Sequence, residues 1–179
     1  FGTSFVQIMP IFADIFHSGE RGYGLLISAT GLGSVTGNLF ISHFQQSRRL
    51  GLMMLTCAAL APFALAGFSL VTGTLANAAG AFWLACFFAV LASAFSSVFL
   101  VSSMTVLQLK VPDNLRGRVM GIHSITFSMI ALGGLASGAL ATKFSAPVAV
   151  VIGAVVVLAS VIWVTIRQGE IISLDGSQL

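Results

Sequence analysis

Few side chains in this sequence could perform acid–base, nucleophilic or metal chemistry, and those few lie far apart. The three histidines do not have the HxxH or HExxH spacing of a zinc site, and Cys57 and Cys86 do not form a CxxC pair. The acidic residues fall at or beyond the ends of the helices expected below; they are Asp14, Glu20, Asp113, Glu170 and Asp175. Because acid–base catalysis needs positioned groups of this kind, the sequence predicts no enzyme, no metal site and no cofactor.

A glycine-rich run at 31–37, GLGSVTG, comes close to the dinucleotide-binding pattern. It lies inside a long uncharged stretch rather than after a strand, and no acidic residue follows at the required distance. We therefore interpret Gly33 and Gly37 as a GxxxG pair, which allows two membrane helices to approach closely. Gly134 and Gly138 form a second pair with the same expected role.

The segment 111–121, VPDNLRGRVMG, is the most informative for function. Pro112 disfavours a helical conformation in the residue before it and so ends one helix, and Asp113 or the asparagine after it can cap the next. Arg116 and Arg118 are then expected in the first turn of that helix, where cations oppose the positive end of the helix dipole. This predicts a compensating anion, either a lipid phosphate or a carboxylate at a neighbouring cytoplasmic helix end.

The charged residues divide the chain into stretches of membrane-spanning length. Residues 22–47, 119–142 and 144–166 contain no Asp, Glu, Lys or Arg, and a helix needs about 20 apolar residues to cross a bilayer. The uncharged stretch 50–109 is long enough for two helices, and the small, polar run at 72–80 divides it. The expected helices are 1–16, 22–44, 50–72, 81–109, 117–141 and 146–167, followed by a cytoplasmic tail at 168–179. The first looks shortened at its start, as in an internal fragment of a longer protein.

Composition supports the same fold class. The chain is 57% hydrophobic and only 7% charged, whereas soluble domains are about 25% charged. Eight basic and five acidic residues could not cover the surface of a soluble domain, and the basic residues are too scattered for a nucleic-acid patch. The run at 148–152 is apolar on both faces, unlike a transmembrane β-strand. The sequence thus predicts an all-α membrane protein with six transmembrane helices.

The distribution of basic residues predicts the orientation of these helices. Positively charged residues are enriched in short cytoplasmic loops. Six of the eight share one side if both ends of the chain are cytoplasmic: Arg48, Arg49, Lys110, Arg116, Arg118 and Arg167. Arg21 and Lys143 fall on the other side.

Polar residues are concentrated in the expected helices 81–109 and 117–141, whereas 146–167 is almost wholly apolar. Polar membrane helices face protein or a water-filled cavity, so the first two are expected to line a path and the last to face lipid. Serine and threonine can instead bond to carbonyls of their own helix, and this simpler role stays open for each residue. The candidate cavity-lining residues are Gln7, Asn38, Ser93, Ser96, Ser103, Gln108, Ser124 and Ser128.

Two groups of motifs resemble the C-terminal half of major facilitator superfamily exporters. QLKVPD at 108–113 with Arg116-Gly117-Arg118 resembles the cytoplasmic loop between its fourth and fifth helices. MPIFAD at 9–14, GYGLL at 22–26 and GLGSVTG resemble its first two helices. The branch that these motifs resemble most is the bacterial group of enterobactin-exporter-like, or transmembrane secretion effector, permeases.

The chain departs from the superfamily pattern in one loop. In the signature loop between the second and third helices, a glycine is followed by an acidic–basic pair and then by clustered arginines. Arg48 and Arg49 follow Gly37 here, but the acidic residue is missing. The charge relay proposed for that motif therefore lacks its acidic member in this half.

The resemblance implies a twelve-helix fold of which this chain is the second six-helix half, in a bacterial inner membrane. It also implies a proton-coupled exporter of small amphipathic molecules, such as a drug or a siderophore, that works by alternating access. The expected partners are membrane lipid, a small-molecule substrate and the missing N-terminal six-helix half, with no nucleic acid. The alternative is a non-transporting polytopic membrane scaffold or assembly subunit, which would need no water-accessible pair of polar helices.

Overall fold

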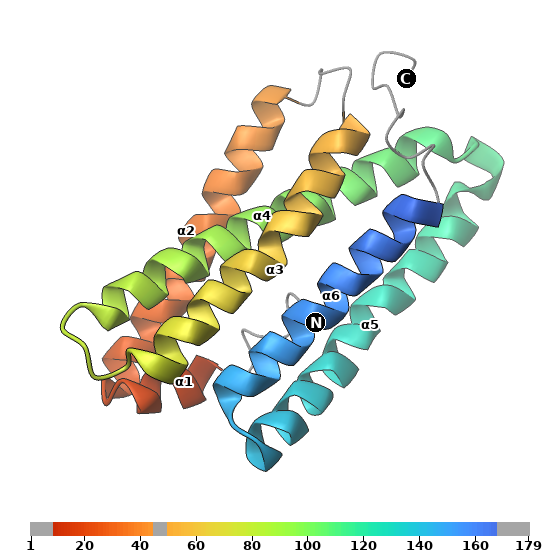
Figure 1. The fold of residues 1–179 in the computed structure, drawn as a ribbon. Coiled ribbons are helices and arrows are strands. Elements are labelled where there is room, and N and C mark those ends of the chain that lie inside the picture. Colours follow the sequence, from red (N-terminus) through yellow and green to blue (C-terminus); the bar gives the residue numbers. More distant parts are fainter. Residues whose placement is uncertain (1–8, 45–49, 168–179) are drawn as a thin grey trace.

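The computed structural model describes residues 9–44 and 50–167, and this part of the chain is helical throughout apart from short turns (Figure 1). This confirms the all-α fold class, while the twelve-helix context stays a prediction. The helices are α1 (Met9–Ile15), α2 (Gly19–Phe44), α3 (Leu50–Thr74), α4 (Ala81–Lys110), α5 (Asp113–Lys143) and α6 (Ala146–Arg167).

Five of these helices, α2 to α6, are long and apolar enough to cross a membrane. Their spanning segments are Gly19–Ser42, Gly51–Thr74, Ala81–Gln108, Gly117–Lys143 and Ala146–Arg167. The described part of α1 has only seven residues. It is followed by a sharp bend in which His17 and Gly19 have φ angles of 51° and 56°. The Ser18 hydroxyl stabilises this bend by donating to the Ala13 carbonyl oxygen over 3.1 Å.

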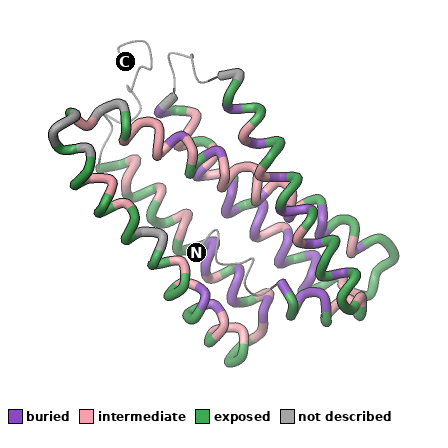
Figure 2. The backbone as a smooth tube through the Cα atoms, turned by 180° about the vertical axis from the view of Figure 1, so that it is seen from behind, coloured by how far each residue is buried: buried purple, intermediate pink, exposed green. Residues whose placement is uncertain are grey.

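The helices pack in the spatial order α2, α4, α3, α6, α5, with α1 against α2. In Figure 1, α4 crosses α2 and α3, and α6 runs beside α5. Buried residues gather where α2, α3 and α4 meet and are sparse along α5 (Figure 2). The helix at 146–167, expected to face lipid, thus has α3 and α5 as neighbours and is not at the edge of this arrangement.

The core is built from small and aromatic side chains. Phe12 of α1 packs edge-on against Phe68 of α3, with ring centroids 4.8 Å apart, and both rings are fully buried. Around them lie alanines of α4, such as Ala85 and Ala89, whose size lets neighbouring helices approach closely. The same core includes Ala146, Val150 and Ala154 of α6, so it joins α1 to α4 and α6 into one packed unit.

The start of α6 is fixed to α3. The Ser69 hydroxyl donates a hydrogen bond of 2.6 Å to the Pro147 carbonyl oxygen. One turn further along α3, a Cβ added at Gly73 would lie 3.3 Å from Cβ of Pro147. Helix α6 is thus packed into the core beside α3, and α5 is attached to the bundle through α6.

Candidate functional site

Helices α2 and α4 approach each other closely at two of the predicted packing residues. Gly33 and Gly37 are both buried and face the backbone of α4. A Cβ added at Gly33 would overlap the Val90 carbonyl oxygen, and one added at Gly37 would lie 2.7 Å from the Ala94 carbonyl oxygen. Any larger residue at either position would push the two helices apart.

Two hydrogen bonds run along the same contact. The Ser93 hydroxyl donates to the Thr30 carbonyl oxygen over 2.6 Å, and the Ser97 hydroxyl donates to Oδ1 of Asn38 over 3.0 Å. Interhelical hydrogen bonds of this kind stabilise membrane helix pairs where the backbones are close. We call these four residues, with Gly33 and Gly37, the α2–α4 seam.

Two of the predicted cavity-lining residues belong to the α2–α4 seam. Asn38 and Ser93 are half-buried, and each has a hydrogen bond to the opposite helix. These hydrogen bonds give both polar side chains a partner, so neither residue needs to face a cavity. Ser97 continues a four-residue spacing of small residues on α4 (85, 89, 93, 97), a pattern typical of a packed helix face. No pattern in the sequence pointed to Thr30, whose backbone carbonyl is the group that takes part.

The other predicted cavity-lining residues lie elsewhere. Ser96 and Ser103 of α4 are half-buried, and Gln108 near its end is exposed. Ser124 and Ser128 are exposed on α5, where the Ser124 hydroxyl donates to the Met120 carbonyl oxygen of its own helix over 3.0 Å. Since α5 packs against α6, these two serines lie away from the seam. Gln7 is outside the described residues.

The second predicted glycine pair differs from the first. Gly134 is buried and its carbonyl oxygen accepts a hydrogen bond from the Ser137 hydroxyl over 3.0 Å. Gly138 is half-buried, and a Cβ added there would meet no atom within 4 Å among the described residues. The structure therefore brings Gly33 and Gly37 into a close helix contact and does not bring Gly138 into one.

The loop between α4 and α5 is shorter than the sequence suggested. Val111 is extended, with φ −87° and ψ 123°, and ends α4, as expected before a proline. Pro112 occupies the N-cap position of α5, which begins at Asp113 and has no side-chain capping hydrogen bond. The expectation that Asp113 or the next asparagine caps this helix is therefore wrong, because the helix already includes both.

Because α5 begins at residue 113 and not at 117, the arginines lie further inside the helix than expected. Arg116 is now the fourth residue of the helix and Arg118 the sixth, and Gly117 and Arg118 are exposed. The dipole effect falls off within the first turn, so the expected penalty on Arg118 is small. This removes the physical need for a compensating anion at Arg118, while Arg116 still lies in the first turn. Arg48 and Arg49 lie outside the described residues.

Two helices carry small residues on faces that point away from this bundle. Gly24, Ser28 and Gly31 of α2 are exposed at helical spacing, and so are four residues of α5: Gly117, Gly121, Ser124 and Ser128. A Cβ added at any of these four glycines would meet nothing within 4 Å. We call the two sets the α2 stripe and the α5 stripe.

The residues in 9–44 and 50–167 do not bring together three or more His, Cys, Asp or Glu side chains that could hold a metal ion. What they do form is a polytopic helical membrane protein with a tight, hydrogen-bonded helix pair and a hairpin attached beside it. Proteins of this kind include secondary transporters.

Comparison with known proteins identifies the family. Residues 1–173 match the family model described as Major Facilitator Superfamily. The chain therefore belongs to the major facilitator superfamily of transporters and is a multi-pass membrane protein. No curated protein and no solved structure matches it.

Proposed function

We propose that this chain is the C-terminal six-helix half of a bacterial inner-membrane exporter. It moves small amphipathic molecules, such as a drug or a siderophore, out of the cell in exchange for protons. The observation that carries this proposal is the pair of outward stripes on α2 and α5. Exposed glycines and serines at helical spacing suit close contact with further helices, and an N-terminal six-helix half would supply them.

Alternating access requires parts that move as units. The α2–α4 seam supports one such unit, because close glycine contacts and two hydrogen bonds hold the two helices together. The hairpin of α5 and α6 is joined to this unit through α3. In our proposal the whole half rocks against the N-terminal half, and the α2 and α5 stripes form the contact between the halves.

Proton coupling needs a titratable group that both sides of the membrane can reach in turn. In the described helices the acidic residues lie near helix ends, with Glu20 in the first turn of α2 and Asp113 at the start of α5. We therefore place the coupling carboxylate in the N-terminal half. The half-buried serines of α4, Ser96 and Ser103, are proposed to contribute hydrogen-bonding groups to the substrate path.

The experiment is transport by the full-length protein in everted membrane vesicles, with a fluorescent amphipathic cation as the substrate. We expect uptake into the vesicles that stops when a protonophore collapses the proton gradient. Uptake that survives the protonophore and requires sodium would contradict the proton as coupling ion. The absence of transport for a broad panel of amphipathic substrates would instead favour the scaffold alternative.

A second experiment tests the division into halves. Residues 1–179 expressed alone are expected to insert into the membrane but to move no substrate, since one face of the transport path is missing. Co-expression with the N-terminal half is expected to restore transport. Transport by the 179 residues alone in proteoliposomes would contradict the proposed division.

A further inference from the structure

The outward face of α6 is a continuous apolar stripe. Its exposed members recur at helical spacing: Val148, Val151, Val155, Ile162 and Ile166. The opposite face of the helix is buried against its neighbours through small residues such as Ala149 and Gly153. In a chain that spans a membrane, an exposed apolar stripe of this length is expected to contact lipid tails.

A cation–aromatic pair lies at the end of this stripe. The guanidinium carbon of Arg167 is 5.7 Å from the centroid of the Trp163 ring, within the range of a cation–π interaction. Both side chains are exposed, Trp163 by 63%. Arg167 also lies in the last turn of α6, where a cation interacts favourably with the helix dipole. The pair is therefore held in place without being covered by protein in the described part of the chain.

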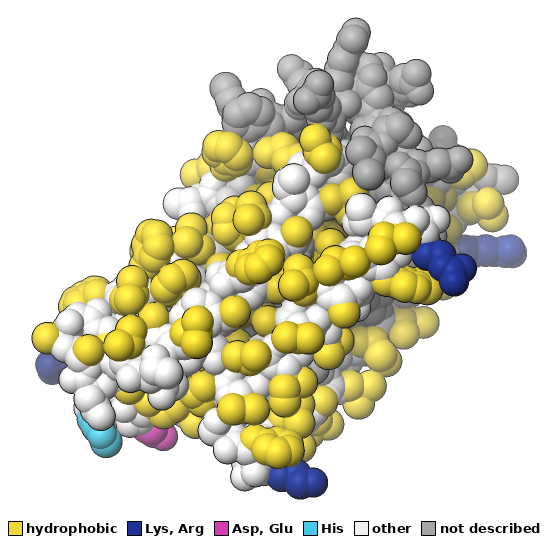
Figure 3. All heavy atoms as spheres, viewed as in Figure 1, with side chains coloured by type: hydrophobic (Ala, Val, Ile, Leu, Met, Phe, Trp, Pro, Cys, Tyr) yellow, Lys and Arg dark blue, Asp and Glu magenta, His cyan; other side chains and the backbone are white. Residues whose placement is uncertain are grey.

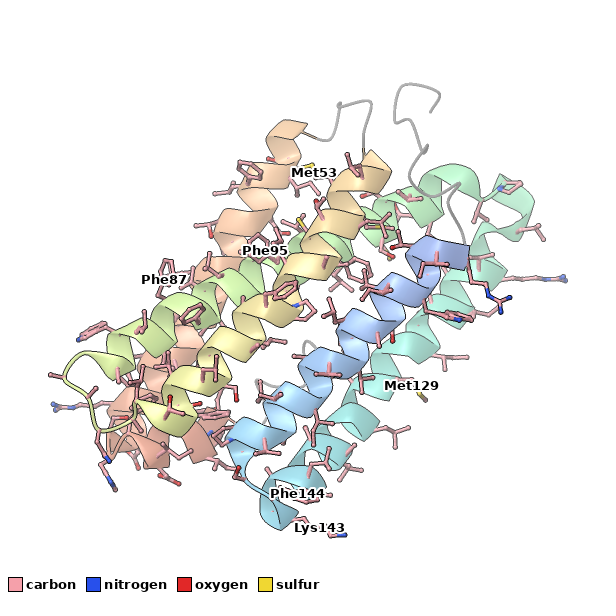
Figure 4. The ribbon with its side chains drawn as sticks, viewed as in Figure 1. Met53, Phe87, Phe95, Met129, Lys143 and Phe144 are labelled. Atoms are coloured by element: carbon pink, nitrogen blue, oxygen red, sulfur yellow. The ribbon has the colours of Figure 1, made fainter. Side chains whose placement is uncertain are left out.

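A second cation and aromatic residue lie at the other end of the stripe. Lys143 ends α5 and Phe144, which is 62% exposed, follows it at the turn into α6 (Figure 4). At 1.5 Å per residue, α6 measures about 26 Å from Ala146 to Trp163, close to the hydrocarbon thickness of a bilayer, about 30 Å. In the space-filling view, basic side chains lie near helix ends and hydrophobic ones between them (Figure 3). Trp163 and Arg167 therefore fall at one bilayer surface.

The charges at this surface favour an anionic ligand. Because α5 and α6 form an antiparallel hairpin, the beginning of α5 lies at the same end of the bundle as the end of α6. Within the described ranges, this end carries Lys110, Arg116 and Arg118 in addition to Arg167, against one acidic residue, Asp113. An anionic headgroup is therefore attracted to it more strongly than a zwitterionic one.

We propose that Trp163 and Arg167 form a binding site for the headgroup phosphate of an anionic phospholipid. The planar guanidinium can donate two hydrogen bonds to one phosphate, while the ring of Trp163 holds it at the level of the headgroups. The bound lipid fixes the depth of α6 in the membrane and, through the contact of Ser69 with Pro147, the position of α3. This inference rests on the chain spanning a membrane and is independent of what is transported.

The test measures lipid binding, not transport. The full-length protein is delipidated in a neutral detergent, and its melting temperature is followed while phosphatidylglycerol or phosphatidylcholine is added. We expect phosphatidylglycerol to bind more tightly. Arg167→Gln should weaken its binding about fivefold, the effect of one cation near an anionic surface. Trp163→Leu should also weaken it, because Arg167 loses the ring that it lies against. Arg167→Lys should retain part of the affinity, because it keeps the charge and loses the two-pronged geometry.

Matched controls come from the other aromatic and basic residues of the chain. Trp83 at the start of α4 is 67% exposed, and Arg21 is an exposed arginine of α2. Trp83→Leu and Arg21→Gln should leave phosphatidylglycerol binding unchanged. Equal binding by all variants, or an equal loss in the controls, would overturn the proposal. So would an equal rise in melting temperature with inorganic phosphate, which would indicate an anion site and not a lipid site. If Arg167→Gln does not fold, Arg167→Lys and Trp163→Leu carry the test.

Discussion

Replacing Gly33 by alanine should destabilise the helix bundle, whereas the same change at Gly138 should not. At Gly33 the new methyl group would overlap the Val90 carbonyl oxygen of α4. Ordinary contact between a carbon and an oxygen atom requires more than 3 Å, so α2 and α4 must separate locally by about 1 Å. That displacement would stretch the 2.6 Å hydrogen bond from Ser93 to Thr30 beyond hydrogen-bonding length.

The cost follows from these two effects. Overfilling a well-packed site costs about 1–3 kcal/mol, and an interhelical hydrogen bond in a membrane protein contributes about 0.6 kcal/mol. Alanine returns up to about 1 kcal/mol because it favours the helix more than glycine does. The net loss for Gly33→Ala should be about 2 kcal/mol, while Gly138→Ala, which has open space around the new methyl group, should be neutral or slightly stabilising.

The assay is reversible unfolding of the full-length protein in mixed micelles by titration with sodium dodecyl sulfate. Both variants are compared with the wild type at the same detergent composition. The reasoning is refuted if Gly33→Ala and Gly138→Ala have the same free energy of unfolding, because the two positions then differ in geometry but not in energy.

The remaining predictions concern topology, the seam and the arginine loop. A cysteine placed at Asn114 should react with a membrane-impermeant reagent only from the cytoplasmic side and one at Asn77 only from the outside; the reverse pattern would show an inverted topology, and labelling of both from one side would show that α4 does not cross the membrane. Ser97→Ala and Asn38→Ala should each cost about 0.5–1 kcal/mol, with a coupling of about 0.6 kcal/mol in a double-mutant cycle; zero coupling by detergent titration would show that their hydrogen bond does not stabilise the fold. Arg118→Gln should insert normally and export at the wild-type rate per inserted molecule, because Arg118 lies beyond the first turn of α5 and does not require a compensating anion. A lower export rate in vesicles that recovers in Arg118→Lys would show that the charge acts in transport.

Sequence reasoning worked where the controlling interaction is local. Pro112 restricts the residue before it, and α4 ends at that point. The run at 72–80 predicted a break between two helices, and Gly80 there has a φ of 89° that favours glycine. The all-α membrane class follows from composition and from the spacing of charges alone, because a lipid-exposed backbone must satisfy its hydrogen bonds within each helix.

The sequence alone could not predict which helices pack against each other. Apolar side chains gain little free energy by leaving lipid for a protein neighbour, so the hydrophobic pattern of a membrane helix does not specify what it packs against. The GxxxG pairs at 33–37 and 134–138 look alike in the sequence, yet a Cβ would overlap α4 at Gly33 and meet open space at Gly138. The hydrogen bond between Ser69 and Pro147 joins residues 78 positions apart. The sequence by itself determined that the chain crosses the membrane as helices; the tertiary structure decided which helices touch, because those contacts depend on the shapes of surfaces far apart in the chain.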